Sequence, residues 1–218
     1  MADRATSGAP ILLVAASGLA REAAAAARAA GREVVGCLDD SEALVGHRVA
    51  PELPVVDCID DVDRYPDAEL VVCAGKGAVR ERLVHRLADH GVEAERYTTI
   101  IHPGATLAPD TVVRPGSVIL AGVVATAQVL VGEHVVVMPN VVLTHDDRIE
   151  PFATLCAGVV LGGAVVVGRA AYVGMAASVR EGLSIGAASL IGMGSVVVRD
   201  VPPAETWAGV PARPLEPG

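Results

Sequence analysis

The chain has 218 residues, of which 52% are hydrophobic and only 2% aromatic, and its formal net charge is −9 at pH 7. This length holds enough apolar material for one large domain or two small ones. The negative charge, without any cluster of Lys and Arg, argues against a nucleic-acid surface, since neutralising phosphates requires such a cluster. The scattered cysteines (Cys37, Cys58, Cys73, Cys156) show no metal-ligand spacing, and we expect buried thiols in a reducing cytoplasm.

Residues 8–99 predict a small Rossmann-like α/β domain with a parallel sheet. The apolar run "ILLVA" indicates a strand, and the turn at Ser17 and Gly18 leads from it into an alanine-rich helix and then into a second strand, "EVVGCLDD". A further strand, "AELVVCAG", leads through Gly75 and Lys76 into the helix "AVRERLVHRLADHG". This order of elements is that of a βαβ unit.

The turn after the first strand is a candidate nucleotide-binding site, because phosphates bind at helix N-termini beside the carboxyl ends of parallel strands. Of a full G-x-G-x-x-G pattern only Gly18 is present, although two aspartates follow after about twenty residues, a spacing that suits a ribose hydroxyl or a base edge. Alternatively, Gly18 only shapes a tight turn and the aspartates cap an exposed loop. The candidate acceptor- or nucleotide-binding residues are Ser17, Gly18, Asp39, Asp40, Gly75 and Lys76.

Residues 100–218 carry a strict period of six. From Ile101 to Val197 every sixth residue is aliphatic, and only Ala125 is not Ile, Leu or Val. A parallel β-helix of triangular cross-section has this period, because one hexad forms each side and three hexads complete a coil. We therefore predict a β-helix of hexapeptide repeats with a C-terminal tail; the alternative is an aliphatic sandwich with coincidental spacing.

The flat sides of such a β-helix would expose many valines, so we expect self-association, most simply as a trimer. The uncharged stretch 151–168 is long enough to span a bilayer. Its glycines, its proline and above all its periodicity argue against a membrane span.

Seven segments together resemble one family: "GLAREAAAAARAAG", "VVGCLDD", "AGKGAVRERL", "IIHPGA", "LTHDDRI", "GSVVVRDVP" and "WAGVPAR". Over nearly its full length the chain resembles the hexapeptide-repeat acyltransferases of the sialic-acid O-acetyltransferase and UDP-amino-sugar (bacillosamine) N-acetyltransferase type. The resemblance implies a left-handed β-helix that forms a homotrimer, with acetyl-CoA in a groove between neighbouring chains. It also implies that the N-terminal domain holds the acceptor, often a nucleotide-linked amino sugar.

The resemblance assigns the catalytic roles to the one polar break in the repeat. His145 becomes the general base and Asp146 its orienting partner, and a neutral imidazole suits the removal of a proton near physiological pH. The residue one coil after His145 is Gly163, whose N–H could polarise the acetyl carbonyl, a role that the family also gives to a glycine amide. Asp147 occupies a small inward or corner position of the hexad, and we expect it at most to cap a turn.

The chain departs from the family on the acceptor side. Where the family commonly has a second histidine nine residues after the first, this chain has Thr154, and the glycine-rich turn is reduced to "AASG". Thr154 and His102, which lies at the domain junction, are weaker candidates for acceptor contacts, and for His102 packing is the alternative. No metal site is expected, because His102, His134 and His145 fall on different sides of the triangle.

These observations predict a cytoplasmic homotrimeric acetyltransferase with active sites between chains. It would transfer an acetyl group directly from acetyl-CoA to an amino group of a sugar, expected to be nucleotide-linked, since no cysteine or serine is placed as a nucleophile beside His145. The alternatives are O-acetylation of a sugar, acylation of a different amine, and a non-catalytic trimeric scaffold. Neither a nucleic acid nor a membrane is an expected partner.

Overall fold

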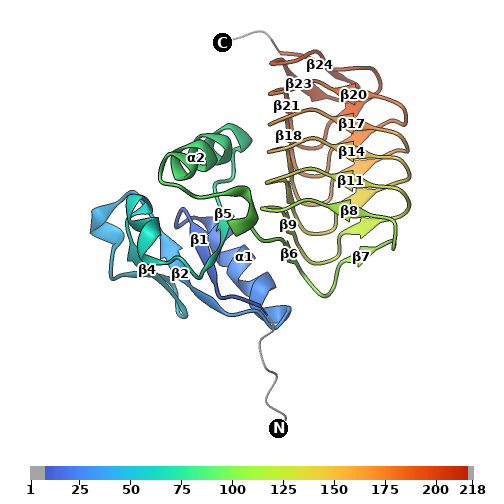
Figure 1. Ribbon diagram of the computed structural model, residues 1–218. Helices are drawn as coiled ribbons and strands as arrows, with labels where there is room; N and C mark the ends of the chain where they lie inside the picture. Colours follow the sequence, from blue (N-terminus) through green and yellow to red (C-terminus); the bar gives the residue numbers. More distant parts are fainter. Residues whose placement is uncertain (1–7, 216–218) are drawn as a thin grey trace.

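The computed structural model describes residues 8–215, which form an α/β domain packed against the side of a long left-handed β-helix (Figure 1). The predicted fold class is thereby confirmed. Strand Ile100–Ile101 begins the β-helix, close to the predicted start of the second domain.

The α/β domain contains a sheet with the strand order β3-β4-β2-β1-β5. Its strands are β1 (Ile11–Val14), β2 (Val34–Leu38), β3 (Arg48–Ala50), β4 (Leu53–Asp57) and β5 (Glu69–Val72). Strands β2, β1 and β5 are parallel, as predicted; β4, which was not predicted, is parallel to β2, and the edge strand β3 is antiparallel to β4. The β3–β4 hairpin was not predicted, because strands this short carry no clear periodicity.

Helix α1 (Gly18–Ala29) follows β1, and α2 (Gly77–Asp89) follows β5. The alanine face of α1 is buried in a cluster that also contains Ile100, Val118 and Val136 of the β-helix. One hydrophobic cluster therefore spans the two domains and fixes how they sit together. The 3-10 helices are η1 (Glu42–Leu44), η2 (Ile59–Arg64) and η3 (Ala94–Arg96).

The β-helix has three faces, each a sheet of short strands. The first face, which meets the α/β domain, contains β6 (Ile100–Ile101), β9 (Val118–Ile119), β12 (Val136–Val137), β15 (Thr154–Leu155), β18 (Tyr172–Val173), β21 (Leu190–Ile191), β23 (Thr206–Gly209) and β24 (Ala212–Pro214). The second face contains β7 (Thr106–Leu107), β10 (Val124–Ala125), β13 (Val142–Leu143), β16 (Val160–Leu161), β19 (Ser178–Val179) and β22 (Val196–Val197). The third face contains β8 (Val112–Val113), β11 (Leu130–Val131), β14 (Arg148–Ile149), β17 (Val166–Val167) and β20 (Ser184–Ile185).

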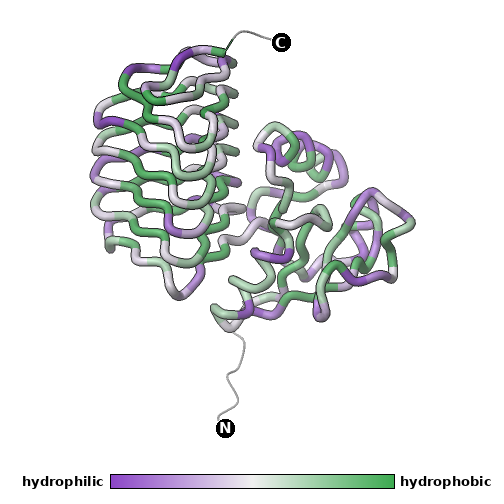
Figure 2. Tube along the Cα trace, turned by 180° about the vertical axis from the view of Figure 1, so that it is seen from behind, coloured by the Kyte–Doolittle hydropathy of each residue, from purple (hydrophilic) through white to green (hydrophobic). Residues whose placement is uncertain are grey.

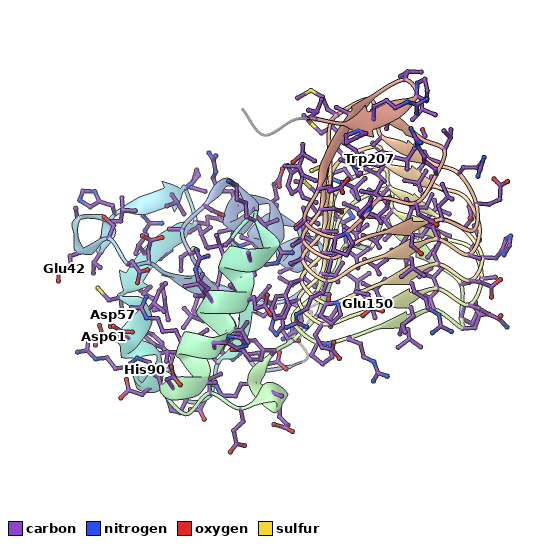
Figure 3. The ribbon with its side chains drawn as sticks, turned by 90° about the horizontal axis from the view of Figure 1, so that it is seen from above. Glu42, Asp57, Asp61, His90, Glu150 and Trp207 are labelled. Carbon is purple, nitrogen blue, oxygen red and sulfur yellow. The ribbon has the colours of Figure 1, made fainter. Side chains whose placement is uncertain are left out.

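The predicted period is found in the strand register. Residues paired across neighbouring coils, such as Val124 and Val142, lie one 18-residue coil apart in the sequence. The aliphatic series is buried from Ile119 to Val197, and hydrophobic residues recur in every coil (Figure 2). The first coil is the exception: Ile101 has 38% of its surface exposed, and Leu107 and Val113 are only half-buried, because no coil lies beneath them. At the other end of the β-helix, Trp207 closes the core (Figure 3).

Three of the four cysteines, Cys37, Cys73 and Cys156, are buried free thiols, as expected. Cys58 is only half-buried, which corrects the prediction: it precedes η2 at the end of β4, where the chain reaches the surface. Between residues 8 and 215, no helix has both the length and the apolar character needed to cross a membrane.

Candidate functional site

The predicted catalytic pair lies at a corner of the β-helix, between the second and third faces. The turn between β13 and β14 carries it, and the His145 side chain is 67% exposed. His145 Nδ1 lies 2.8 Å from Asp146 Oδ2. The Asp146 backbone has φ 64°, a left-handed conformation that aspartate tolerates better than most residues. A carboxylate on Nδ1 favours the tautomer with its proton there, which leaves Nε2 free to accept a proton.

Gly163 lies beside the imidazole ring, where the period predicts it. A Cβ on Gly163 would lie 2.3 Å from His145 Nε2, so only glycine leaves room for the ring. Ala164 N–H donates to His145 O at 2.8 Å and holds the two coils together. Within residues 8–215 the N–H of Gly163 has no acceptor, although Gly162 and Ala164 on either side both donate hydrogen bonds. The corner therefore places a free imidazole nitrogen next to a free amide.

Asp147 is fully buried, which corrects the expectation that it only caps a turn. Its Oδ2 accepts from Thr144 N–H at 2.8 Å, and its Oδ1 accepts from Val165 N–H at 2.9 Å in the next coil. Burial raises the pKa of this carboxyl to about 6, against the lowering effect of those two hydrogen bonds. The signal in the sequence was an acid at an inward position of the hexad.

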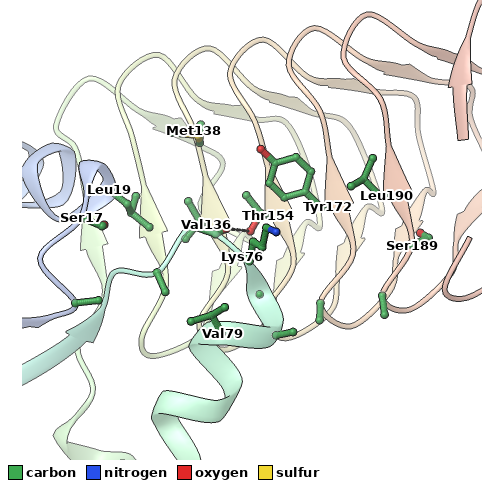
Figure 4. A pocket seen from close by; sticks show the side chains of 17 residues that line it. Ser17, Leu19, Lys76, Val79, Val136, Met138, Thr154, Tyr172, Ser189 and Leu190 are labelled. Carbon is green, nitrogen blue, oxygen red and sulfur yellow. Dashed lines mark hydrogen bonds between the residues drawn. The ribbon is translucent and has the colours of Figure 1, made fainter. Parts of the chain in front are cut away.

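A second feature is a pocket between the domains, with a volume of about 820 Å³. It runs along the first face of the β-helix and past the starts of both helices of the α/β domain (Figure 4). Of the predicted acceptor residues it is lined by Ser17, Gly75, Lys76 and Thr154. It is also lined by apolar and aromatic side chains that the sequence reading missed, namely Leu19, Met138, Tyr172 and Leu190. We call this cavity the interdomain pocket.

Both helices begin at the interdomain pocket. Ser17 caps α1: its Oγ accepts from Ala20 N–H at 3.2 Å and donates to Cys73 O at 2.5 Å. Gly18, the first residue of α1, lines a shallower groove that shares Gly75 with the pocket. Lys76 stands directly before α2. Two helix N-termini and a lysine give this end of the pocket a positive potential, which suits an anionic ligand.

The two predicted nucleotide aspartates do not line the interdomain pocket. Asp39 accepts from Ala16 N–H at 2.8 Å and Ser41 N–H at 3.0 Å, so it holds the turn in shape from behind. Asp40 forms a surface ion pair with Arg86 at 2.6 Å. These placements match the alternative in which the aspartates serve the loops. Other acids of the domain, Asp57 and Asp61 among them, lie on the side away from the β-helix (Figure 3).

The guanidinium of Arg80 joins α2 to the β-helix and was missed by the sequence reading. It is fully buried and donates to oxygens of both domains, including Ala74 O at 2.8 Å and Phe152 O at 2.7 Å. Burial lowers the pKa of Arg80 to about 10, so it remains charged at neutral pH. Thr154 Oγ1 accepts from Arg80 at 3.0 Å and donates to Gly75 O at 3.0 Å. The Thr154 hydroxyl therefore bridges the β-helix and the α/β domain.

The other two histidines of the β-helix, His102 and His134, lie at its other two corners, as their hexad offsets predict. His102 is half-buried, and its Nδ1 accepts from Gly104 N–H at 2.9 Å, a local turn contact. His134 is buried and stacks on Phe152 with ring centroids 5.1 Å apart. Burial lowers the pKa of His134 to about 4 and keeps it neutral. Among residues 8–215, no group of three His, Cys, Asp or Glu side chains is arranged to hold a metal ion.

Comparisons with known proteins support this description. Residues 10–87 match the family described as the PglD N-terminal domain. A mutant of perosamine N-acetyltransferase from Caulobacter crescentus, solved with CoA and GDP-perosamine, is 28% identical with a TM-score of 0.87, covering 95% of this chain and 97% of that one. The acetyltransferase domain of PglB from Neisseria gonorrhoeae, solved with acetyl coenzyme A, is 25% identical with a TM-score of 0.87, covering 96% of this chain and 100% of that one.

WeeI from Acinetobacter baumannii shares the fold at 22% identity and a TM-score of 0.63, covering 94% of this chain and 99% of that one. A search of curated protein sequences gave no match. The resemblance drawn from the sequence is nevertheless confirmed, because both domains occur together in these structures. The chain is an acyltransferase that is similar over nearly its full length to hexapeptide-repeat sugar acetyltransferases, and its residues 10–87 match the PglD N-terminal domain.

Proposed function

We propose that this protein transfers an acetyl group from acetyl-CoA to an amino group of a nucleotide-linked sugar, with His145 as general base. The observation that carries the proposal is the corner where His145, oriented by Asp146 at 2.8 Å, lies against Gly163. The bound molecules of the neighbours support the substrates: one neighbour holds CoA and GDP-perosamine, and another holds acetyl coenzyme A.

The proposed reaction is a direct transfer. Asp146 holds the proton on Nδ1, and Nε2 takes a proton from the amine as the amine attacks the thioester carbonyl. The free N–H of Gly163 donates to the oxygen that becomes negative. The carbon–sulfur bond then breaks, the acetyl group stays on the nitrogen, and the CoA sulfur leaves with the proton from His145. No covalent bond to the protein forms.

The acceptor is proposed to bind in the interdomain pocket. The N-termini of α1 and α2, together with Lys76, would hold the phosphates of a nucleotide. The apolar side chains farther along the first face, Tyr172 and Leu190 among them, would pack against the sugar. This division of the pocket into a positive end and an apolar end suits a nucleotide-linked sugar better than a small free amine.

We further propose that the protein is cytoplasmic and that it works as a homotrimer. The trimer is proposed because the two parts of the site lie on different sides of one β-helix. The interdomain pocket follows the first face, whereas His145 lies at the corner between the other two and does not line the pocket. The second face presents only uncharged residues outward from its strands, among them Val124, Val142 and the 43% exposed Val160. Packing that face against a neighbour would bring His145 to the neighbour's pocket.

The test is acetyl transfer from acetyl-CoA, followed by thiol release, with UDP-, TDP- and GDP-linked amino sugars as acceptors. We expect one of them to be acetylated with sequential kinetics, and His145→Ala to lower kcat by about a hundredfold or more. Transfer at an unchanged rate in His145→Ala would refute the assignment of the base. Binding of acetyl-CoA without transfer to any nucleotide-linked sugar would move the acceptor to free sugars, sugar hydroxyls or other amines.

A further inference from the structure

The interior of the β-helix contains a carboxylate, that of Asp147, at a position where the neighbouring coils have an aliphatic residue. One coil before Asp147 and one coil after it, the same inward position is held by Val129 and Val165, both buried. Among the buried residues between 8 and 215, Asp147 is the only carboxylate. A charged side chain in an aliphatic core destabilises the fold unless its hydrogen bonds are satisfied. Its presence therefore needs a reason other than packing.

Asp147 changes the hydrogen bonds between coils at one place. In the coils before and after, Thr126 N–H donates to Leu143 O at 3.1 Å and Gly162 N–H donates to Val179 O at 2.8 Å. By this pattern Thr144 N–H would donate to Leu161 O, but it donates to Asp147 Oδ2 at 2.8 Å instead. Leu161 O accepts from the Thr144 hydroxyl at 3.2 Å.

The strand pairing records the same change. Strands β10 and β13 pair through two residue pairs, Val124 with Val142 and Ala125 with Leu143. Strands β13 and β16 keep only the pair of Val142 with Val160. The regular ladder is therefore interrupted directly before the turn that carries the proposed base.

The two amides that Asp147 binds flank the two proposed catalytic groups. Thr144 directly precedes His145, and Val165 follows Gly163 by two residues in the next coil. The amides equivalent to Val165 N–H in the neighbouring coils, at Asp147 and Leu183, donate no backbone hydrogen bond within residues 8–215. Other side chains also join neighbouring coils, as Ser117 Oγ does with Val135 N–H and Asp200 Oδ1 with Ser184 N–H, but within residues 8–215 only Asp147 does so as a buried carboxylate.

We propose that Asp147 is a positioning residue for acyl transfer: its buried carboxylate ties the segment before His145 to the segment after Gly163, and so sets the distance between the base and the oxyanion donor. The inference rests on the proposed function of His145. A carboxylate is suited to the task because each of its two oxygens accepts from one of the two amides. Valine offers no acceptor and asparagine only one oxygen, so either substitution releases at least one amide.

The test compares Asp147→Val with Ser117→Val. Ser117 is a matched control because it is also buried and inward, accepts from Val135 N–H one coil away at 3.0 Å, and lies in another coil and at another corner. We expect Asp147→Val to fold and to lower kcat about ten- to a hundredfold, since small displacements of reacting groups have effects of that size. We expect Ser117→Val to keep kcat within about twofold of the wild type, as a purely structural site should. An unchanged kcat in Asp147→Val would overturn the proposal.

A second readout does not depend on activity. In the wild type, the ¹⁵N shifts of the His145 ring should report one tautomer with its proton on Nδ1, and in Asp147→Val we expect this signal to move or broaden. If the wild type acetylates no acceptor, the proposed function fails, and the ring shifts alone decide on Asp147: identical shifts in both proteins would overturn its positioning role. Should Asp147→Val not fold, Asp147→Asn takes its place, with the same two readouts and the same overturning results.

Discussion

At the scale of single residues, the proposed mechanism depends on how closely His145 and Gly163 approach each other. A Cβ on Gly163 would lie 2.3 Å from Nε2, which is far inside van der Waals contact. The glycine is therefore required by the side chain one coil below it. The period of the sequence predicted this pair, because residues one coil apart stack in a β-helix.

Gly163→Ala should displace the imidazole and lower kcat by at least about tenfold, since misplaced catalytic groups have effects of that size. The change lies at an exposed corner, so the melting temperature should move by only a few degrees. Steady-state kinetics and thermal unfolding measure the two effects. The control is the double variant with His145→Ala, which should be no slower than His145→Ala alone. A further loss in the double variant would show that the glycine acts independently of the histidine.

The stability of the protein should also respond to Asp147. Because burial raises the pKa of this carboxyl to about 6, from 3.8, the folded protein holds the proton more tightly than the unfolded chain between those values. The free energy of unfolding contributed by this group therefore falls as the pH rises through that window. The charges that act on it are those of His145 and Asp146, whose effects are smaller than that of burial.

We accordingly expect Asp147→Val to melt several degrees above the wild type at about pH 7.5 and closer to it at about pH 4. A series of thermal unfolding curves in this range measures the difference. A constant difference at every pH would contradict the assignment of the titrating group. A variant that is more stable but less active would show that the carboxylate serves function at the expense of the fold.

At the scale of elements, the strands of the β-helix could be predicted from the sequence, whereas the hairpin at the edge of the α/β sheet could not. Each strand of the β-helix follows from a hexad whose aliphatic residue must face inward, so the register could be read directly from the sequence. The β3–β4 hairpin lacks such a pattern. Arg80 was missed for a different reason: in "AVRERL" every charged residue looks exposed, and only the packing of α2 on the β-helix decides which one is buried. The burial of Asp147 and its bond to the next coil were not predicted, because a polar residue next to a turn usually only caps that turn.

Arg80→Met should weaken the contact between the two domains. It leaves Phe152 O and the Thr154 hydroxyl without their donor in a buried interface, which we expect to lower the free energy of unfolding by about 3 kcal/mol. The acceptor's KM should rise more than the KM for acetyl-CoA, because only the pocket lies between the domains. Chemical denaturation and kinetics measure both effects. The matched control is Arg82→Met, an exposed arginine of the same helix, which should behave like the wild type.

At the scale of the whole molecule, the proposed site needs two chains. The pocket of one chain and His145 of the same chain lie on different sides of the β-helix, and the uncharged second face is available to a neighbour. A charge on that face, as in Val160→Arg, should reduce the trimer and the activity together. Sedimentation velocity and steady-state kinetics on the same samples check this. A monomeric variant with full activity would contradict the shared site.

A mixing experiment tests the same point without breaking the assembly. His145→Ala lacks the base, and Tyr172→Arg would block the pocket; each alone should be inactive. After the two are unfolded and refolded together in equal amounts, about a quarter of the sites should combine an intact pocket with an intact neighbouring base. Recovery of about a quarter of the wild-type activity supports sites between chains. No recovery, with mixed trimers shown to be present, would place the whole site in one chain.

The most direct test of the central claim follows labelled acetyl-CoA through a single turnover with wild type and His145→Ala, using a nucleotide-linked amino sugar. We predict that the label passes straight to the sugar nitrogen in the wild type and never appears on the protein, and that it moves at least about a hundredfold more slowly without the histidine. Label that accumulates on the protein, or transfer at the wild-type rate without His145, would contradict this prediction.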